Sequence, residues 1–314
     1  MKNIIIFGGG RWARIILSEL ISSKKCKKIL VVTPNNYDFM ADWVRQSNFA
    51  EIIKVNYRCM DLKAYDGCII ANKALDHYKT AISTIRVGIP TLIEKPYTLS
   101  TKDVKRLISA ANLSNTVALP AYVYNFCHYI EKFKKIVRLS ENIKGIKFIW
   151  TDEIFENRHG ETKYIDKTIS IFDDILPHIL SILNNVFEEG FEENPEIIFS
   201  NMKSFVQINI NMCNIKAEII LSNNYIFRQR NLSFVDKNGY HALDFSNESW
   251  NIDSAYLPEN NQGKIIHNSM KTMLCSFLDG IDLNRYDERF DVTNLKKNYS
   301  LIEKLNTKIN DQNL

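Results

Sequence analysis

Three consecutive glycines separate the first apolar segment of the chain from its first amphipathic segment, and no other feature constrains the fold as strongly. Residues 3–7 are almost wholly apolar, as expected of a strand covered on both faces, and residues 11–21 have helical periodicity. With Ala13 in the third position, residues 8–13 match the pattern GxGxxG/A between a strand and a helix. The chain therefore opens with a βα unit whose helix begins at a glycine turn.

The alternation of apolar strands and helical segments continues to about residue 120. Strands are expected at 3–7, 28–33, 52–55, 67–71, 90–93 and 116–119, and helices at 11–21, 37–46, 77–87 and 102–111. Such alternation is typical of a parallel sheet with helices on both faces. Residues 1–120 are therefore predicted to form a doubly wound, Rossmann-type α/β domain.

The pattern changes in residues 121–314. Helices are expected at 129–139, 168–186, 267–278 and 293–308, and strands at 146–151, 205–212, 217–222, 227–235 and 240–245. Because Asn, Gly and Lys turns separate the later strands, we predict an α+β domain with an open, mostly antiparallel sheet. Strands such as 204–210 and 217–221 carry apolar residues on both faces, which predicts a homodimer or higher oligomer through the outer face of this sheet.

Composition and charge exclude several classes of partner. The 40 Lys and Arg residues exceed the 36 Asp and Glu residues by only four and are spread along the chain, so nucleic acid is not expected. No apolar run reaches the roughly 18 residues of a membrane span, and no leader-like segment precedes the first strand. The six cysteines have no metal-binding spacing. We expect a cytoplasmic protein with no metal site and no membrane partner.

The glycine turn suits a dinucleotide. Gly8 permits a tight turn, Gly10 lets the backbone approach a pyrophosphate, and the N–H groups at the helix N-terminus attract the anion. The candidate cofactor contacts in this turn are Gly8, Gly9, Gly10, Arg11 and Trp12.

The end of the second strand bears on the choice of cofactor. The residues there are Thr33-Pro34-Asn35-Asn36, without the carboxylate that usually binds the ribose 2′-OH of NAD. Thr33 and the asparagines can donate to a 2′-phosphate, and Arg11 can add charge. We therefore expect NADP to be preferred, with NAD possible.

A lysine follows the fifth strand of the first domain. Residues 90–93 are apolar and lead into Glu94-Lys95-Pro96. Ligands of open α/β sheets bind outside the carboxyl ends of the strands, so Lys95 is expected to face the nicotinamide end of a bound cofactor. There it can polarise a carbonyl oxygen, although a surface lysine in a loop is an equally good interpretation.

An acid and a histidine interrupt the apolar helix of the second domain. Asp174 and His178 are four residues apart and so share one helical face. A carboxylate beside an imidazole holds it in position and suits general acid/base chemistry. A purely structural Asp–His pair is the commoner meaning of such a couple.

Taken together, these motifs resemble the glucose–fructose oxidoreductase and inositol dehydrogenase family of nicotinamide-dependent oxidoreductases, over nearly the whole chain. The resemblance implies a tightly bound NAD or NADP and a sugar, cyclitol or nucleotide-linked sugar as substrate. It makes Lys95 the catalytic lysine, His178 the acid/base and Asp174 the residue that orients the substrate. It also adds cofactor contacts after the fourth and fifth strands, at Ala71, Asn72, Glu94 and Pro96.

The sequence departs from the family pattern at the helix that carries the histidine. Leu176 stands where the family usually has glycine, and Ser181 stands where it often has aspartate. Two alternatives therefore remain open beside a sugar dehydrogenase. One is a reductase of a thiazoline or other imine in a secondary-metabolite pathway, and the other is a cofactor-binding regulator of the same fold without catalysis.

Overall fold

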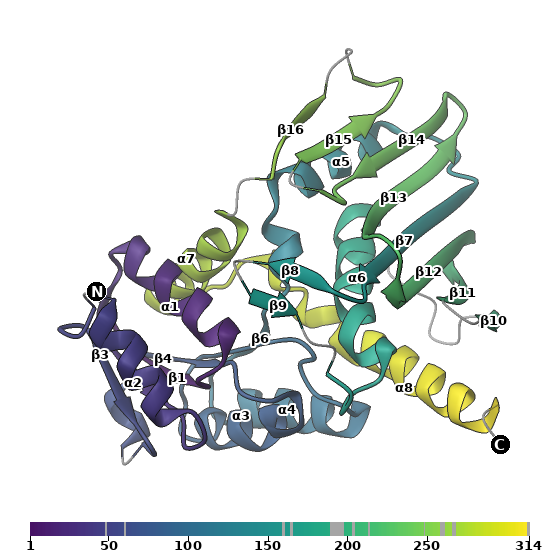
Figure 1. The fold of residues 1–314 in the computed structure, drawn as a ribbon. Helices are drawn as coiled ribbons and strands as arrows, with labels where there is room; N and C mark the ends of the chain where they lie inside the picture. Colours follow the sequence, from purple (N-terminus) through teal and green to yellow (C-terminus); the bar gives the residue numbers. More distant parts are fainter. Residues whose placement is uncertain are drawn as a thin grey trace. The chain divides into compact units, whose positions relative to one another are not determined.

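The computed structural model describes residues 1–312 except 48, 60, 159–160, 164–165, 189–197, 203–204, 213, 248, 258–260 and 266–267. The chain divides into two compact units, one formed by Met1–Phe126 with His267–Leu314 and the other by Cys127–Ile266. Figure 1 labels most of the helices and strands of both units. Within the described part of the chain, no helix is both long and apolar enough to cross a membrane.

Unit 1 is built on a six-stranded parallel sheet with the order β3-β2-β1-β4-β5-β6. Its strands are β1 (Lys2–Phe7), β2 (Cys26–Val32), β3 (Ile53–Asn56), β4 (Gly67–Ile70), β5 (Thr91–Ile93) and β6 (Ala118–Pro120). The central residues of β1 and β4 are fully buried, as their apolar runs predict. This strand order confirms the doubly wound Rossmann-type sheet, in which ligands bind at the carboxyl ends of the strands.

Six α-helices belong to the described part of unit 1. They are α1 (Arg11–Ser23), α2 (Tyr37–Gln46), α3 (His77–Ile85), α4 (Thr101–Leu113), α7 (Asn268–Leu283) and α8 (Leu295–Gln312). Short 3₁₀ helices occur at Leu62–Ala64, Ala74–Asp76, Val123–Phe126, Glu288–Phe290 and Val292–Asn294. Buried residues of α1 and α7, among them Leu17 and Phe277, share one core with β1.

The two closing helices do not follow the predicted boundary at residue 120. The prediction assigned residues 121–314 to the second domain, but α7 packs against α1 and α8 packs against α4. Helical periodicity reveals that these helices bury an apolar face, but it does not say against which partner. Unit 1 is therefore discontinuous in sequence.

Unit 2 contains an eight-stranded sheet with the order β10-β11-β12-β7-β13-β14-β15-β16. Its strands are β7 (Gly145–Glu153), β10 (Ile198–Met202), β11 (Phe205–Met212), β12 (Ile215–Tyr225), β13 (Gln229–Asp236), β14 (Gly239–Asp244), β15 (Ser249–Asp253) and β16 (Gln262–Lys264). A separate ladder joins β8 (Glu156–Arg158) to β9 (Glu161–Lys163). Only the β7–β12 pair is parallel among the described pairs of the larger sheet, which confirms an open, mostly antiparallel sheet.

Helices α5 (His128–Leu139) and α6 (Ile171–Phe187) cover one face of this sheet. Phe133 of α5 and Phe187 of α6 both contact the ring of Phe234 on β13. Ser170 is the N-cap of α6, and its side chain accepts a hydrogen bond from the backbone N–H of Asp173. The helix continues through Pro177. Most of its residues are buried, and the polar side chains of Asp173, His178, Ser181 and Asn184 lie in the interior of unit 2.

Candidate functional site

The glycine turn holds β1, β4 and the start of α1 close together. Gly8 has φ +140°, a region that favours glycine, and a Cβ there would lie 2.2 Å from the carbonyl oxygen of Ala71. Gly10 differs, because nothing outside its own neighbourhood lies within 4 Å of the position a Cβ would take. It is also the N-cap of α1 and makes no side-chain capping bond. The helix start therefore presents backbone N–H groups beside open space.

The end of β2 packs against this turn. A Cβ at Gly9 would lie 2.2 Å from Oγ1 of Thr33, a residue that is itself buried. Asn36 Nδ2 donates to the carbonyl oxygen of Gly9 over 3.2 Å. At the carboxyl ends of β2 and β3, the rings of Tyr37 and Tyr57 stack with centroids 4.0 Å apart.

These observations fit a dinucleotide cofactor. The packing around the turn accounts for Gly8 and Gly9, and the open side of Gly10 leaves room for a phosphate at the N-terminus of α1. Arg11 and Trp12 begin the same helix, and Trp12 is 43% exposed. The carboxyl ends of β2 and β3 add polar and aromatic side chains on the adenosine side.

The segment after β5 contains the predicted lysine. Glu94 is buried, Lys95 is half-buried, and the Lys95–Pro96 peptide bond is cis. The backbone N–H of Lys95 donates to Oε2 of Glu94 over 3.3 Å. Burial raises the pKa of Glu94 to about 7, while the neighbouring Lys95 ammonium and the hydrogen bond act in the opposite direction.

A buried histidine connects this segment to the loop after β4. Nδ1 of His77 lies 2.7 Å from the carbonyl oxygen of Pro96, and Nε2 lies 3.2 Å from that of Asn72. Burial lowers the pKa of His77, and the hydrogen bonds to the carbonyl oxygens of Pro96 and Asn72 act in the opposite direction. Since Gly8 packs on Ala71 and Asn72, an unbroken series of contacts joins the glycine turn to the lysine segment.

The C-terminal helix secures the same segment from another direction. The backbone N–H of Tyr97 donates to the hydroxyl of Tyr299 on α8 over 2.5 Å. The hydroxyl of Tyr97 donates to the carbonyl oxygen of Ala118. These two hydrogen bonds hold the backbone just after Lys95 against α8 and β6.

In unit 2, the predicted acid/base residues lie one turn apart on α6. Asp174 is in the first turn and is half-buried, while His178 is 8% exposed. The neighbouring Asp173 interacts with the capping hydroxyl of Ser170 over 2.7 Å. The imidazole of His178 stacks on the indole of Trp150, with centroids 5.7 Å apart and planes 15° apart.

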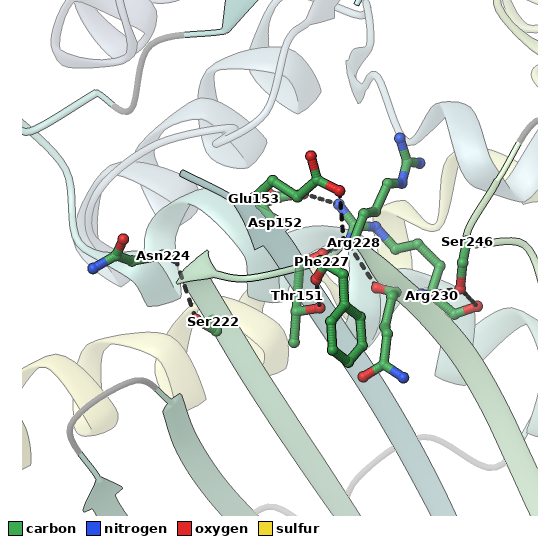
Figure 2. A network of polar contacts seen from close by, with 10 residues as sticks. Thr151, Asp152, Glu153, Ser222, Asn224, Phe227, Arg228, Arg230 and Ser246 are labelled. Carbon is green, nitrogen blue, oxygen red and sulfur yellow. Dashed lines mark hydrogen bonds and ion pairs between the residues drawn. The ribbon is translucent and has the colours of Figure 1, made fainter. Parts of the chain in front are cut away.

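Trp150 is also in contact with a buried cation. The guanidinium carbon of Arg230 lies 3.9 Å from the centroid of the indole ring. Nη2 of Arg230 pairs with the carboxylate of Asp152, and Nη1 donates to the carbonyl oxygen of Thr151 (Figure 2). The ion pair is 1% exposed on the arginine side and 5% on the aspartate side.

Several of these residues were not identified from the sequence. No motif in the sequence singles out His77, and Tyr299 lies in a helix that the sequence assigns to the other domain. Arg230 could have been found from the sequence. It is two residues before Leu232 and four before Phe234, so it shares their face of the strand. A charged residue at an inward position of a strand indicates a buried pair or a functional group.

Searches with the sequence found neither a matching family model nor a matching curated protein. Solved structures with the same arrangement exist at low sequence identity. UDP-N-acetylglucosamine 3-dehydrogenase GnnA from Acidithiobacillus ferrooxidans is 15% identical, with a TM-score of 0.76 and 96% coverage of both chains. The chain has the fold of this dehydrogenase. The likeness extends along almost its entire length.

Two further structures share this fold. KijD10, a 3-ketoreductase from Actinomadura kijaniata solved with NADP and TDP-benzene, is 13% identical, with a TM-score of 0.77 over 96% of this chain and 95% of its own. The dehydrogenase MviM from Clostridium difficile is 14% identical, with a TM-score of 0.73 over 98% and 99% of the two chains.

Proposed function

We propose that the chain is a nicotinamide-dependent oxidoreductase of the glucose–fructose oxidoreductase and inositol dehydrogenase family. The proposed reaction moves a hydride between nicotinamide C4 and a carbonyl or secondary alcohol carbon of a sugar, cyclitol or nucleotide-linked sugar. The observation that carries the proposal is the series of contacts from the open glycine turn to the half-buried lysine after β5. The shared fold supports it, because the similar proteins include a nucleotide-sugar dehydrogenase and a ketoreductase.

In this proposal each part of the reaction is assigned to its own residue. A bound nicotinamide supplies or accepts the hydride, and the chain supplies the remaining functions. Lys95 polarises the reacting oxygen with its ammonium group. His178 gives or takes the proton at its ring nitrogen, and Asp174 orients a substrate hydroxyl. The cofactor would be held by Gly8 to Gly10, Arg11, Trp12, Ala71, Asn72, Glu94 and Pro96.

The proposal is tested with Lys95→Ala and His178→Ala. A screen of carbonyls, polyols and imines that follows nicotinamide absorbance first identifies a substrate. Each variant should then lose about 10²–10⁴-fold in kcat, as expected for lost acid/base or electrostatic help, while still binding the cofactor. Wild-type turnover in both variants would contradict the assignment.

The same screen separates the alternatives. Turnover of imines alone would identify an imine reductase, and tight cofactor binding without any turnover would identify a regulator.

We propose NADP as the preferred cofactor. The segment between β2 and α2 contains no carboxylate, and the side chains there include Thr33, Asn35 and Asn36. The stacked Tyr37 begins α2. A charge-assisted contact with the 2′-phosphate contributes about 1.5–3 kcal/mol, which corresponds to a preference of roughly tenfold or more. Equal kcat/KM values for NADH and NADPH would contradict this. A preference that survives Arg11→Ala would assign the selectivity to the residues after β2.

A further inference from the structure

The buried charge of Arg230 has no role in the reaction proposed above. Its side chain is almost completely inaccessible and cannot contact a substrate directly. Burying an arginine and a carboxylate requires removing both from water, and an apolar pair of similar volume often stabilises a fold as well or better. The position of this ion pair therefore calls for an explanation other than stability alone.

The ion pair fixes the plane of the guanidinium. Nη2 binds the carboxylate of Asp152, and Nη1 donates to the carbonyl oxygens of Thr151 and Gln229, the latter over 2.7 Å. The backbone N–H of Arg230 donates to Ser246 Oγ over 2.8 Å (Figure 2). Both ends of the residue are therefore held, and the guanidinium has little rotational freedom.

The guanidinium in turn holds an indole ring. Arg230 on β13 lies directly opposite Trp150 on β7 in the antiparallel register. Its guanidinium carbon is 3.9 Å from the indole centroid, within the range of a desolvated cation–π contact. The nearly parallel imidazole of His178 then contacts this same indole.

We propose that Arg230, Asp152 and Trp150 act together as positioning residues for His178. The ion pair fixes the guanidinium, the guanidinium fixes the indole, and the indole fixes the plane of the imidazole. The χ2 torsion of a histidine otherwise takes a broad range of values, and an indole packed on one face of the ring restricts it. Proton transfer requires such a fixed orientation of the ring. The catalytic meaning of this arrangement rests on the function proposed for His178.

The charges around the histidine support an orienting role. Arg230 and Asp152 carry opposite charges, so the pair adds no net charge next to His178. Asp173 and Asp174 lie on the same helix as His178. Removing the whole pair should therefore change the orientation of the ring more than its electrostatic environment.

The chain offers a matched control in the same unit. On α5 and β15, Lys132 lies 4.7 Å from the ring of Trp250, and His128 contacts that ring edge-on at 79°. This set also places a cation and a histidine against a tryptophan, but the cation is a lysine and the histidine is not stacked face to face. Trp250→Leu therefore tests whether removing a different tryptophan from the same unit also changes the environment of His178.

The experiment observes the histidine rings by NMR in protein with isotope-labelled histidine. The His178 signals are assigned with His178→Asn. In the wild type, the ring protons should be displaced upfield by the indole ring current. Trp150→Leu and the double variant Arg230→Met/Asp152→Leu should abolish this displacement, and Trp250→Leu should leave it unchanged. The double variant removes both charges, so no lone buried ion prevents folding.

Kinetics provide the second measurement. Once a substrate is known, the double variant should lose about 10–100-fold in kcat, as expected for a misoriented group, with KM changed less than about threefold. Trp150→Phe should restore much of the activity lost in Trp150→Leu. Unchanged His178 signals in the folded double variant would overturn the proposal. Wild-type turnover by His178→Ala would contradict the proposed catalytic function of His178. The NMR measurement would then still test whether Arg230, Asp152 and Trp150 orient its ring.

Discussion

Glu94 places a carboxyl group where a carboxylate is costly. The side chain is buried at the end of β5, and only the adjacent Lys95 and one backbone N–H favour its charged form. The balance of these effects raises its pKa to about 7. Near neutral pH, Glu94 therefore exchanges a proton next to the proposed catalytic lysine, and the charge of the segment depends on pH.

This raised pKa predicts a pH-dependent stability. In the unfolded chain Glu94 ionises near 4.5, so between that value and about 7 the folded state holds a proton that the unfolded state has lost. Its stabilising contribution is fully present below pH 4.5 and is lost as the pH rises through about 7. At about 1.4 kcal/mol per pH unit, the loss amounts to about 3 kcal/mol.

Glu94→Gln should remove this dependence. Denaturant unfolding of the wild type should show lower stability at pH 8 than at pH 5, and the variant should show a smaller difference by about 3 kcal/mol. Glu141→Gln, which replaces an exposed carboxylate paired with Lys237, serves as the control. Identical pH profiles for the wild type and Glu94→Gln would contradict the raised pKa.

The three glycines should respond differently to alanine. Gly8→Ala combines an unfavourable φ with a clash on Ala71, so it should lower the free energy of unfolding by at least about 1–3 kcal/mol. Gly10→Ala meets open space and should cost only about 1 kcal/mol, the usual effect at an N-cap.

Gly10→Ala should affect cofactor binding much more than it affects stability. A methyl group at Gly10 would occupy the space proposed for the pyrophosphate, so NADPH affinity should fall at least tenfold in a fluorescence titration. A Gly10→Ala protein that binds NADPH normally would show that the phosphate lies elsewhere.

At the scale of elements, α8 contributes to the site through one hydroxyl. Tyr299→Phe would leave the buried backbone N–H of Tyr97 without its acceptor, at a cost of about 1–3 kcal/mol in unfolding free energy. The exposed Tyr240 provides the control, since Tyr240→Phe should change stability by less than about 0.5 kcal/mol. Equal stabilities of the two variants would show that the α8 contact is unimportant.

The elements could be predicted where their periodicity was strong. The six strands and four helices of residues 1–120 were expected within a few residues of their observed bounds, because buried parallel strands are continuous apolar runs. Strands β10, β15 and β16 were not expected. They lie toward the edges of the sheet, and a segment such as Gln262–Lys264 has no apolar alternation to detect.

The candidate site could be predicted only in part. Lys95 and His178 follow from short local motifs, whose spacing is visible in the sequence. The contacts of His77 with Pro96 and of Trp150 with His178 join segments about 20 to 30 residues apart, and Arg230 lies much farther along the chain. Such pairings depend on strand register and helix packing, which a single sequence does not specify.

At the scale of the molecule, the outer face of the unit 2 sheet is more polar than expected. The inward residues of β11 are Val206, Ile208, Ile210 and Met212, whereas its half-buried outward residues include Gln207, Asn209 and Asn211. Beside them, Ile149 and Ile220 are paired across β7 and β12, and Lys147 pairs with Glu218 over 3.2 Å. The apolar part of this face is therefore confined to a few side chains.

We still predict a homodimer through this face, with amides and the two isoleucines as its contacts. Light scattering at micromolar concentration should give twice the mass of one chain. Ile149→Glu/Ile220→Glu should halve that mass, because it places uncompensated charge in the centre of the contact. Phe39→Glu, which changes an exposed residue of α2, should not. A monomeric wild type would refute the prediction.

The division of unit 1 into two sequence segments affects how the protein is made. During synthesis the six strands of the unit 1 sheet leave the ribosome first. Helices α7 and α8, which pack on α1 and α4, leave it last, after the whole of unit 2. Apolar residues such as Leu17, which share a core with α7 in the folded protein, stay exposed to water or bound to a chaperone until α7 has been synthesised. Unit 2 is continuous and can complete its own fold during that interval. A nascent chain arrested just before α7 would therefore carry a protease-resistant second unit attached to a protease-sensitive first one.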